Sequence, residues 1–192
     1  MRSRTRTHAA LLVMLAVVVA GLSAWPAAGL NSSMTTKSDP IDDLEALKGG
    51  KSANASVRKA TDLTSVAFGS GVGRSSFKLR WCTRKASSPS LSPGTSYAYK
   101  AIVAYPGAAV MVGEIIVYVS PDGVRTGTVG LQGSSASVRS KVDSNCVTAS
   151  VPVAAFPSHV SRLQLAMGTE IVNFSPRFTL MDHGPARWID LR

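Results

Sequence analysis

Most of the chain after residue 76 alternates apolar and polar side chains in short runs. In the first run Phe77, Leu79 and Trp81 fall on one side and Lys78 and Arg80 on the other, which is the period of a half-buried β-strand. Similar runs cover residues 97–105, 109–119, 124–131, 145–153, 160–167, 170–174 and 177–181. Such a series predicts an all-β fold, a single antiparallel β-sandwich of jelly-roll or immunoglobulin-like type.

Clusters of Gly, Pro, Ser and Asp separate these runs, and such residues favour turns. They are found at residues 89–94, 106–107, 121–123, 132–135, 156–158, 175–176 and 184–185. The glycine-rich stretch at 69–73 is not followed by the lysine and helix of a phosphate-binding loop, so it indicates a turn or a strand edge.

The N-terminus has the layout of a secretory signal peptide. Arg2, Arg4 and Arg6 precede an uninterrupted run of apolar residues and Gly over 9–22, and small residues follow. We expect a signal peptide over residues 1–29, with cleavage after Gly29 favoured over Ala24. An uncleaved N-terminal anchor is the alternative. No other run is long enough to span a membrane, so we expect a secreted or extracellular protein.

Residues 30–50 are expected to form a linker and a short helix. Ser38 or Asp39 can cap that helix, Pro40 suits its first position, and Gly49-Gly50 ends it. The remaining residues, 51–192, are assigned to the β-sandwich domain.

The chain is basic, and all of its acidic residues lie after the leader. Removal of three arginines with the leader leaves 18 Lys and Arg against 11 Asp and Glu, a net charge of +7. This charge favours anionic partners such as acidic cell-wall glycans, nucleic acid or lipid headgroups, or serves only solubility.

Two cysteines, Cys82 and Cys146, lie in the exported part of the chain. An even number of cysteines in an oxidising compartment predicts one disulfide bond. Their Cα atoms must then lie within about 7 Å of each other.

The sequence contains no motif for catalysis, a metal or a cofactor. His159 and His183 are the histidines after the leader, and Asp182-His183 is followed at once by Gly184-Pro185, which favours a polar turn over a catalytic pair. Neither histidines nor carboxylates cluster at ligand spacing. We therefore expect no metal and no cofactor, and a binding protein in preference to an enzyme. A hydrolase that pairs two of the carboxylates across a cleft is the alternative, but the sequence does not indicate which two.

Aromatic side chains are the candidates for ligand binding. Tyr97, Tyr99 and Tyr105 fall on one face by period-two counting, where they can stack on sugar rings or else line the core. Trp188 is either an exposed anchor or a lid on the core. The basic cluster around Trp81 fits a solvated strand face, and export argues against nucleic acid as the partner.

Two segments resemble secreted carbohydrate-binding modules of the jelly-roll type. They are Pro93–Lys100, which contains Gly-x-x-Tyr, and Phe178–Asp182, an aromatic-x-x-x-Asp motif. The resemblance covers about residues 70–183 and implies a sandwich fold. The paired exposed tryptophans of such modules are missing here, so the family's binding residues are not carried over.

These observations lead to two hypotheses about function. The first is a secreted, non-catalytic protein that holds an extracellular or cell-wall glycan on one sheet face, for which the tyrosine row is the candidate site. The second is a structural or protein-interaction domain of the envelope that has no small ligand.

Overall fold

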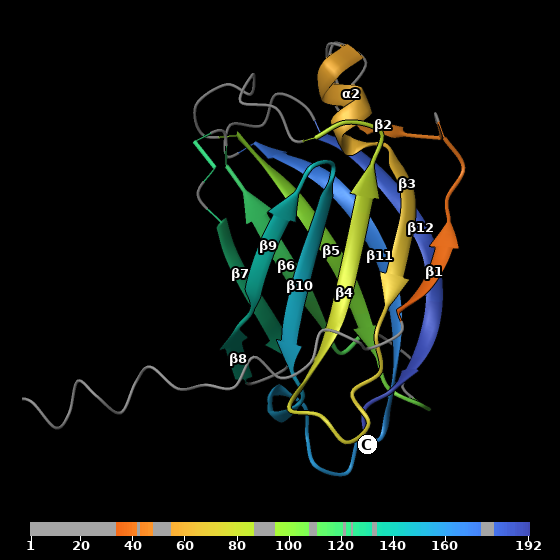
Figure 1. Ribbon diagram of the computed structural model, residues 1–192, viewed down its shortest axis with the longest axis vertical. Coiled ribbons are helices and arrows are strands. Elements are labelled where there is room, and N and C mark those ends of the chain that lie inside the picture. The colour runs from red at the N-terminus through yellow and green to blue at the C-terminus, as the bar shows by residue number, and fades with distance from the viewer. Residues whose placement is uncertain are drawn as a thin grey trace, which may run out of the picture. The chain divides into compact units, whose positions relative to one another are not determined.

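Two antiparallel sheets pack face to face in the computed structural model, and Figure 1 views them with the five-stranded sheet in front. The structure describes residues 34–41, 43–47, 55–86, 95–107, 111–120, 122–123, 125–131, 134–173 and 179–192. The predicted all-β sandwich is confirmed, and residues Ser33–Arg192 form one compact unit.

The five-stranded sheet has the order β1-β3-β4-β10-β9. Its strands are β1 (Thr35–Ser38), β3 (Leu63–Phe68), β4 (Ser76–Thr83), β10 (Cys146–Pro152) and β9 (Arg139–Asp143).

The seven-stranded sheet has the order β2-β12-β11-β5-β6-β7-β8. Its strands are β2 (Glu45–Leu47), β12 (Thr179–Asp190), β11 (Arg162–Asn173), β5 (Thr95–Ala104), β6 (Gly113–Val119), β7 (Arg125–Leu131) and β8 (Ser134–Ser137).

The period-two patterns place the core between the sheets. In β4, Phe77, Leu79 and Trp81 are buried and face the seven-stranded sheet, whereas Lys78 and Arg80 lie on the outer side. The Trp81 ring packs edge-on against Tyr99 of β5 at 6.3 Å between centroids. Its indole Nε1 donates a hydrogen bond to the Lys100 carbonyl oxygen at 2.9 Å, so one side chain joins the two layers.

The disulfide bond between Cys82 and Cys146 is confirmed, with Cα atoms 4.1 Å apart. The two residues are directly paired on the neighbouring strands β4 and β10. The bond therefore crosses between strands of one sheet, unlike the inter-sheet bridge of immunoglobulin domains.

A short helix is present, but not where the sequence pattern predicts it. Glu45–Leu47 form strand β2, and helix α2 spans Ala55–Thr61. The prediction of a helix after Asp39 is wrong because the segment pairs with the edge of β12, and an isolated helix of two turns is marginal without such packing. Since β1 and β2 belong to the sheets, the sandwich begins before residue 51.

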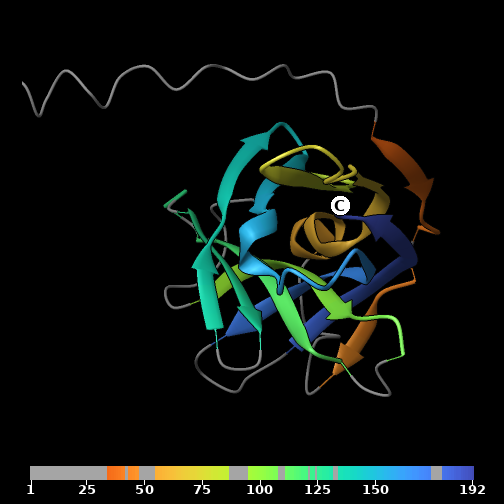
Figure 2. The same ribbon diagram turned by 90° about the horizontal axis from the view of Figure 1, so that it is seen from below.

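Helix α2 closes one end of the sandwich, where Figure 2 shows it between the two layers. It buries Val57, Ala60 and Thr61. A one-turn 3-10 helix, Val153–Ala155, lies after β10, and the Arg192 guanidinium donates to the carbonyl oxygen of Pro157 at 2.8 Å beside it.

Strand β12 continues through the segment that was expected to be a turn. Between Ala166 and Gly168 of β11 there is one residue, whereas two residues, Gly184 and Pro185, separate their partners on β12. This is a β-bulge, which reverses the side of the sheet that successive residues face. Beyond it Ile189 is buried, and before it Asp182 is buried while His183 is exposed.

The expected turns at 106–107 and 121–123 are confirmed at their described residues. Gly107 and Gly123 adopt φ of 79° and 80°, which favours glycine.

Candidate functional site

The tyrosine row lies mainly inside the protein. Tyr97 and Tyr99 are 2% and 1% exposed and belong to the core, so the prediction that they form an exposed sugar platform is wrong for these two. Tyr105 is partly buried and packs on the same core, where burial raises the pKa of its hydroxyl. The alternative interpretation, that the row lines the core, describes this arrangement.

Trp188 is exposed on the outer face of the seven-stranded sheet, with 38% of its surface accessible. The Arg162 guanidinium lies over its ring at 5.6 Å from the centroid, and Arg162 also pairs with Asp190 at 2.9 Å. Nearby, Lys100 forms an ion pair with Glu170. Arg162 and Lys100 are thus each paired with a carboxylate.

Asp182 and His183 do not form a catalytic pair. The bulge leaves Asp182 2% exposed on the inner side of β12, while His183 faces out and lies 3.8 Å from Glu45. His159 is exposed in the loop after the 3-10 helix. Within the described part of the chain, no base is therefore placed beside a nucleophile and an orienting acid.

The outer face of the five-stranded sheet carries basic residues in two parallel rows. Register places Lys78, Ser150 and Arg139 in one row. The next row holds Arg80, Thr148 and Lys141. We call these six residues, on β4, β10 and β9, the basic face. The outer side of this sheet is turned toward the viewer in Figure 1.

The four cations of the basic face lie at the corners of a near rectangle. Residues two apart on a strand are about 7 Å apart, and β4 and β9, one strand removed from each other, are about 10 Å apart. At such distances in water the mutual repulsion of each pair is below about 1 kcal/mol, so the four charges can lie side by side on one face.

One acidic residue, Asp143, lies next to the basic face on β9, where it is paired with Cys146. No ion pair joins Lys78, Arg80 or Lys141 to a carboxylate of a described residue. The Arg80 Nε atom is buried and has no hydrogen-bond partner within the described ranges. Lys78, Arg80 and Lys141 thus carry charges that no carboxylate of a described residue neutralises.

A hollow of about 210 Å³ lies beside the basic rows. Arg80, Cys82 and side chains of the neighbouring strands line it, namely Thr36, Ser65 and Ala67. The hollow continues the basic face toward β1 with hydroxyl groups, which can donate to and accept from a polar ligand.

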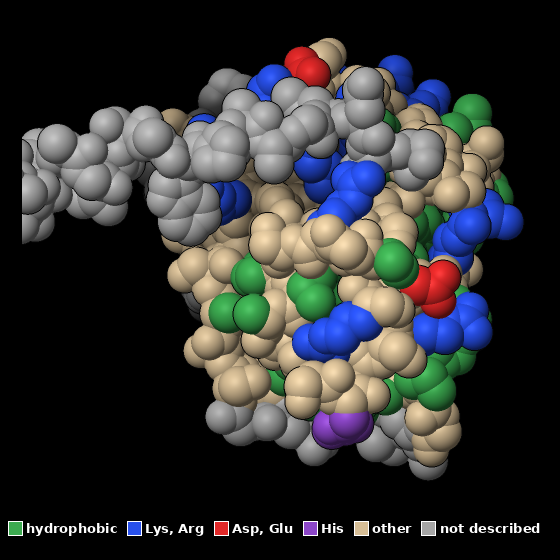
Figure 3. All heavy atoms as spheres, turned by 60° about the horizontal axis from the view of Figure 1, so that its bottom comes forward, with side chains coloured by type: hydrophobic (Ala, Val, Ile, Leu, Met, Phe, Trp, Pro, Cys, Tyr) green, Lys and Arg blue, Asp and Glu red, His purple; other side chains and the backbone are tan. Residues whose placement is uncertain are grey.

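Figure 3 shows the lower end of the molecule, where basic side chains again cover more of the surface than acidic ones.

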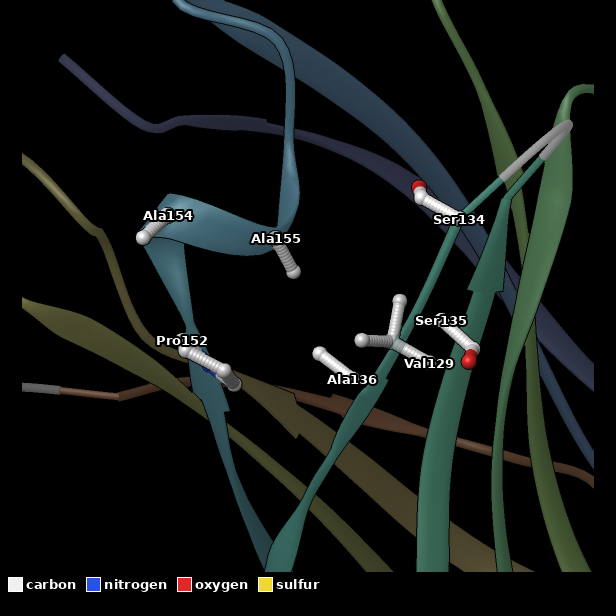
Figure 4. Close-up of a pocket in the computed structure, with 7 residues that line it drawn as sticks. All are labelled: Val129, Ser134, Ser135, Ala136, Pro152, Ala154 and Ala155. Carbon is white, nitrogen blue, oxygen red and sulfur yellow. The ribbon is translucent and has the colours of Figure 1, made fainter.

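A second hollow, of about 270 Å³, offers no charged group. It lies between the β7–β8 hairpin and the 3-10 helix and is lined by alanine, serine, proline and Val129 (Figure 4). In Figure 4 the side chains of Ala136 and Ala155 point into the space between the hairpin and the 3-10 helix. Without a titratable side chain it has no means for acid–base chemistry or for holding an ion.

Two carboxylates near the N-terminus of the described chain meet a third that is distant in sequence. Oxygen atoms of Asp39, Asp43 and Asp182 lie within 4.8 Å of one another. Sequence reasoning missed this group because Asp39 and Asp43 were assigned to a helix and Asp182 to a turn. Only the crossing of the chain from β1 to β2, beside β12, brings them together.

The fold and the disulfide define the chain as a disulfide-bonded antiparallel β-sandwich. Comparisons with known proteins add no assignment: no family model, no curated protein and no solved structure matches it. Among the described residues, none of the helices has the length and apolar character needed to cross a membrane.

Proposed function

We propose that this chain is a secreted, non-catalytic binding protein that holds an acidic extracellular or cell-wall glycan on its basic face. The single observation that carries the proposal is the pair of basic rows on β4, β10 and β9, in which Lys78, Arg80 and Lys141 form no ion pair with a carboxylate of a described residue. The proposal keeps the glycan hypothesis and moves its site from the tyrosine row to the opposite sheet.

The chemistry of the face suits a polymer with repeated anionic groups. A guanidinium binds a carboxylate or phosphate with two parallel hydrogen bonds, and Arg80 and Arg139 stand at diagonal corners. Ser150 and Thr148 lie between the cations and offer hydroxyls to the sugar hydroxyls of the same chain. An extended polymer can lie along the rows because their cations are repeated at the spacing of alternate strand residues.

Binding to polygalacturonate, a polymer of carboxylated sugars, tests the proposal, with polyphosphate as a second anion and dextran as an uncharged glycan. We expect retention on polygalacturonate that weakens as salt screens the charges, and none on dextran. Retention on polyphosphate alone would assign the face to phosphate polymers and contradict the glycan.

A matched pair of double variants separates this face from the general positive charge of the protein. Arg80→Gln/Lys141→Gln removes one basic row, while Arg74→Gln/Arg125→Gln removes two exposed charges elsewhere. We expect the first to weaken binding at least about tenfold, or 1.4 kcal/mol, and the second less than about twofold. Equal losses would show that only net charge matters and would refute the site.

The second hypothesis, an envelope protein-interaction domain, is favoured by the exposed apolar side chains of the other sheet. Trp188 and Ile102 are 38% and 43% exposed on the outer face of the seven-stranded sheet. Crosslinking on intact cells distinguishes the two: a defined protein partner linked through this face, with no binding to acidic glycans, would replace the first proposal.

A further inference from the structure

The three-carboxylate group at the edge of the sandwich has no role in the proposed glycan site. Asp39 follows β1, Asp43 precedes β2, and Asp182 lies on β12. The chain crosses from the five-stranded to the seven-stranded sheet between the first two, because β1 pairs with β3 and β2 pairs with β12. The group therefore lies where the segment between β1 and β2 passes strand β12.

Two of these carboxylates are buried and incompletely hydrogen bonded. Asp182 is 2% exposed; its Oδ2 atom accepts a hydrogen bond from the Leu63 amide at 2.6 Å, and its Oδ1 atom is buried without a partner among the described residues. Asp39 is 8% exposed, and its Oδ2 atom is likewise buried and unpartnered. A buried polar atom without a partner costs about 1–3 kcal/mol, and more when it is charged.

Nearby cationic side chains do not neutralise the group. The Arg84 guanidinium is paired with Asp62, a buried carboxylate outside the group, at 3.0 Å. His183 faces away to the outer side, where it lies near Glu45. No salt bridge from a described residue reaches Asp39, Asp43 or Asp182. The group thus concentrates negative charge without a protein counterion in the described ranges.

We propose that Asp39, Asp43 and Asp182 bind one divalent cation, and that this cation is Ca²⁺. Carboxylate oxygens are the ligands of hard cations. Two oxygens on one Ca²⁺, each about 2.3–2.6 Å from the ion, are at most about 5 Å apart, whereas on Mg²⁺ they are at most about 4.2 Å apart. The oxygens of the group all lie within 4.8 Å of one another, so the larger and more adaptable coordination sphere of Ca²⁺ accommodates them with little movement.

The electrostatics of the group agree with this assignment. Burial, followed by the charges of Asp182 and other aspartates, raises the pKa of Asp39 to about 7. Burial also raises the pKa of Asp182 to about 6, against the lowering effect of the Leu63 amide. Both shifts mean that the ionised form of these carboxyl groups is disfavoured when no cation is bound. A dication removes that penalty and leaves the remaining ligand positions to water or carbonyl oxygens.

The bound ion would have a structural role, holding the segment between β1 and β2 against the sheet. Asp39 and Asp43 flank the crossover segment, and its ends pair with sheet edges over only a few residues. Coordination by Asp182 would attach that segment to β12 and stabilise the folded state by mass action. This inference does not depend on glycan binding.

Calcium titration of the chelator-treated chain, followed by calorimetry and thermal unfolding, tests the proposal. We expect one Ca²⁺ per chain, a higher unfolding temperature in CaCl₂ than in EDTA, and weaker stabilisation by MgCl₂. Asp43→Asn serves as the main variant because Asp43 is exposed and its replacement leaves the core intact. It should weaken Ca²⁺ binding at least tenfold.

Asp122→Asn is the matched control, since Asp122 is an exposed aspartate in a turn outside the group. It should bind Ca²⁺ as the unaltered chain does. Folded protein that shows neither heat of binding nor thermal stabilisation at millimolar Ca²⁺ would overturn the proposal. So would an Asp43→Asn variant with unchanged affinity, because the ion would then lie elsewhere.

Discussion

Removal of the disulfide bond should destabilise the sandwich without preventing its folding. The change is the double variant Cys82→Ser/Cys146→Ser, which leaves no free thiol. The bond closes a loop with a sequence separation of 64 residues. In the chain-entropy model a loop of this length contributes about 4 kcal/mol to the free energy of unfolding.

Other interactions of the same strands limit the damage. The structure pairs β4 with β10 at seven positions from Cys146–Cys82 to Pro152–Ser76, and the pairing does not require the covalent bond. The core beneath the bond, including Trp81 and Val147, is also independent of it. We therefore expect a loss of about 2–5 kcal/mol with the fold retained.

Denaturant unfolding followed by tryptophan fluorescence measures the loss, because Trp81 is fully buried next to the bond. The unaltered protein with and without reductant is the control, and reduction should reproduce the effect of the variant. A loss below about 1 kcal/mol would refute the loop-entropy reasoning. Two titratable thiols in the native, unreduced protein would show that the bond itself is absent.

Three further changes test the packing and the charges. Trp81→Phe should cost about 1–3 kcal/mol in unfolding free energy, since it removes the hydrogen bond between the layers and leaves the partly buried Lys100 carbonyl oxygen without this donor. Gly113→Ala should destabilise strongly, because its Cβ would lie 2.3 Å from the Gly130 carbonyl oxygen, whereas Gly130→Ala, with nothing within 4 Å, should be nearly neutral in the same denaturation assay. In EDTA, stability should fall as pH rises from 4 to 7, because Asp39 and Asp182 hold protons in the folded state that the unfolded chain has released. The shift for Asp39 alone corresponds to at most about 4 kcal/mol, and an Asp39→Asn variant with the same pH profile would contradict this assignment.

The strands that cross the core could be predicted because their inner residues all face one environment. In β4 every second side chain is buried, and the alternation of Phe77, Leu79 and Trp81 was sufficient to identify it. The disulfide followed from the number of cysteines. The tyrosines show the limit of this approach: alternation assigns Tyr97 and Tyr99 to one face but does not state which face meets water.

Features that depend on strand pairing could not be predicted in the same way. Residues 45–47 carry helix-favouring signals, but pairing with the edge of β12 determines their structure. The bulge at Gly184-Pro185 reverses the orientation of Asp182 and His183, and its position depends on the register with β11. The carboxylate group and the basic face both depend on such registers. The sequence contains the residues of the carboxylate group and of the basic face, but it does not show which of them lie side by side.

The most direct test of the glycan proposal is amide chemical-shift mapping of the ¹⁵N-labelled protein during titration with oligogalacturonate. We predict that the largest shifts fall on β4, β10 and β9, at the residues of the two basic rows and beside the hollow next to Arg80. They should disappear in the Arg80→Gln/Lys141→Gln variant. Shifts centred on Trp188 and the outer face of the other sheet, or no saturable shifts at low salt, would contradict the proposal.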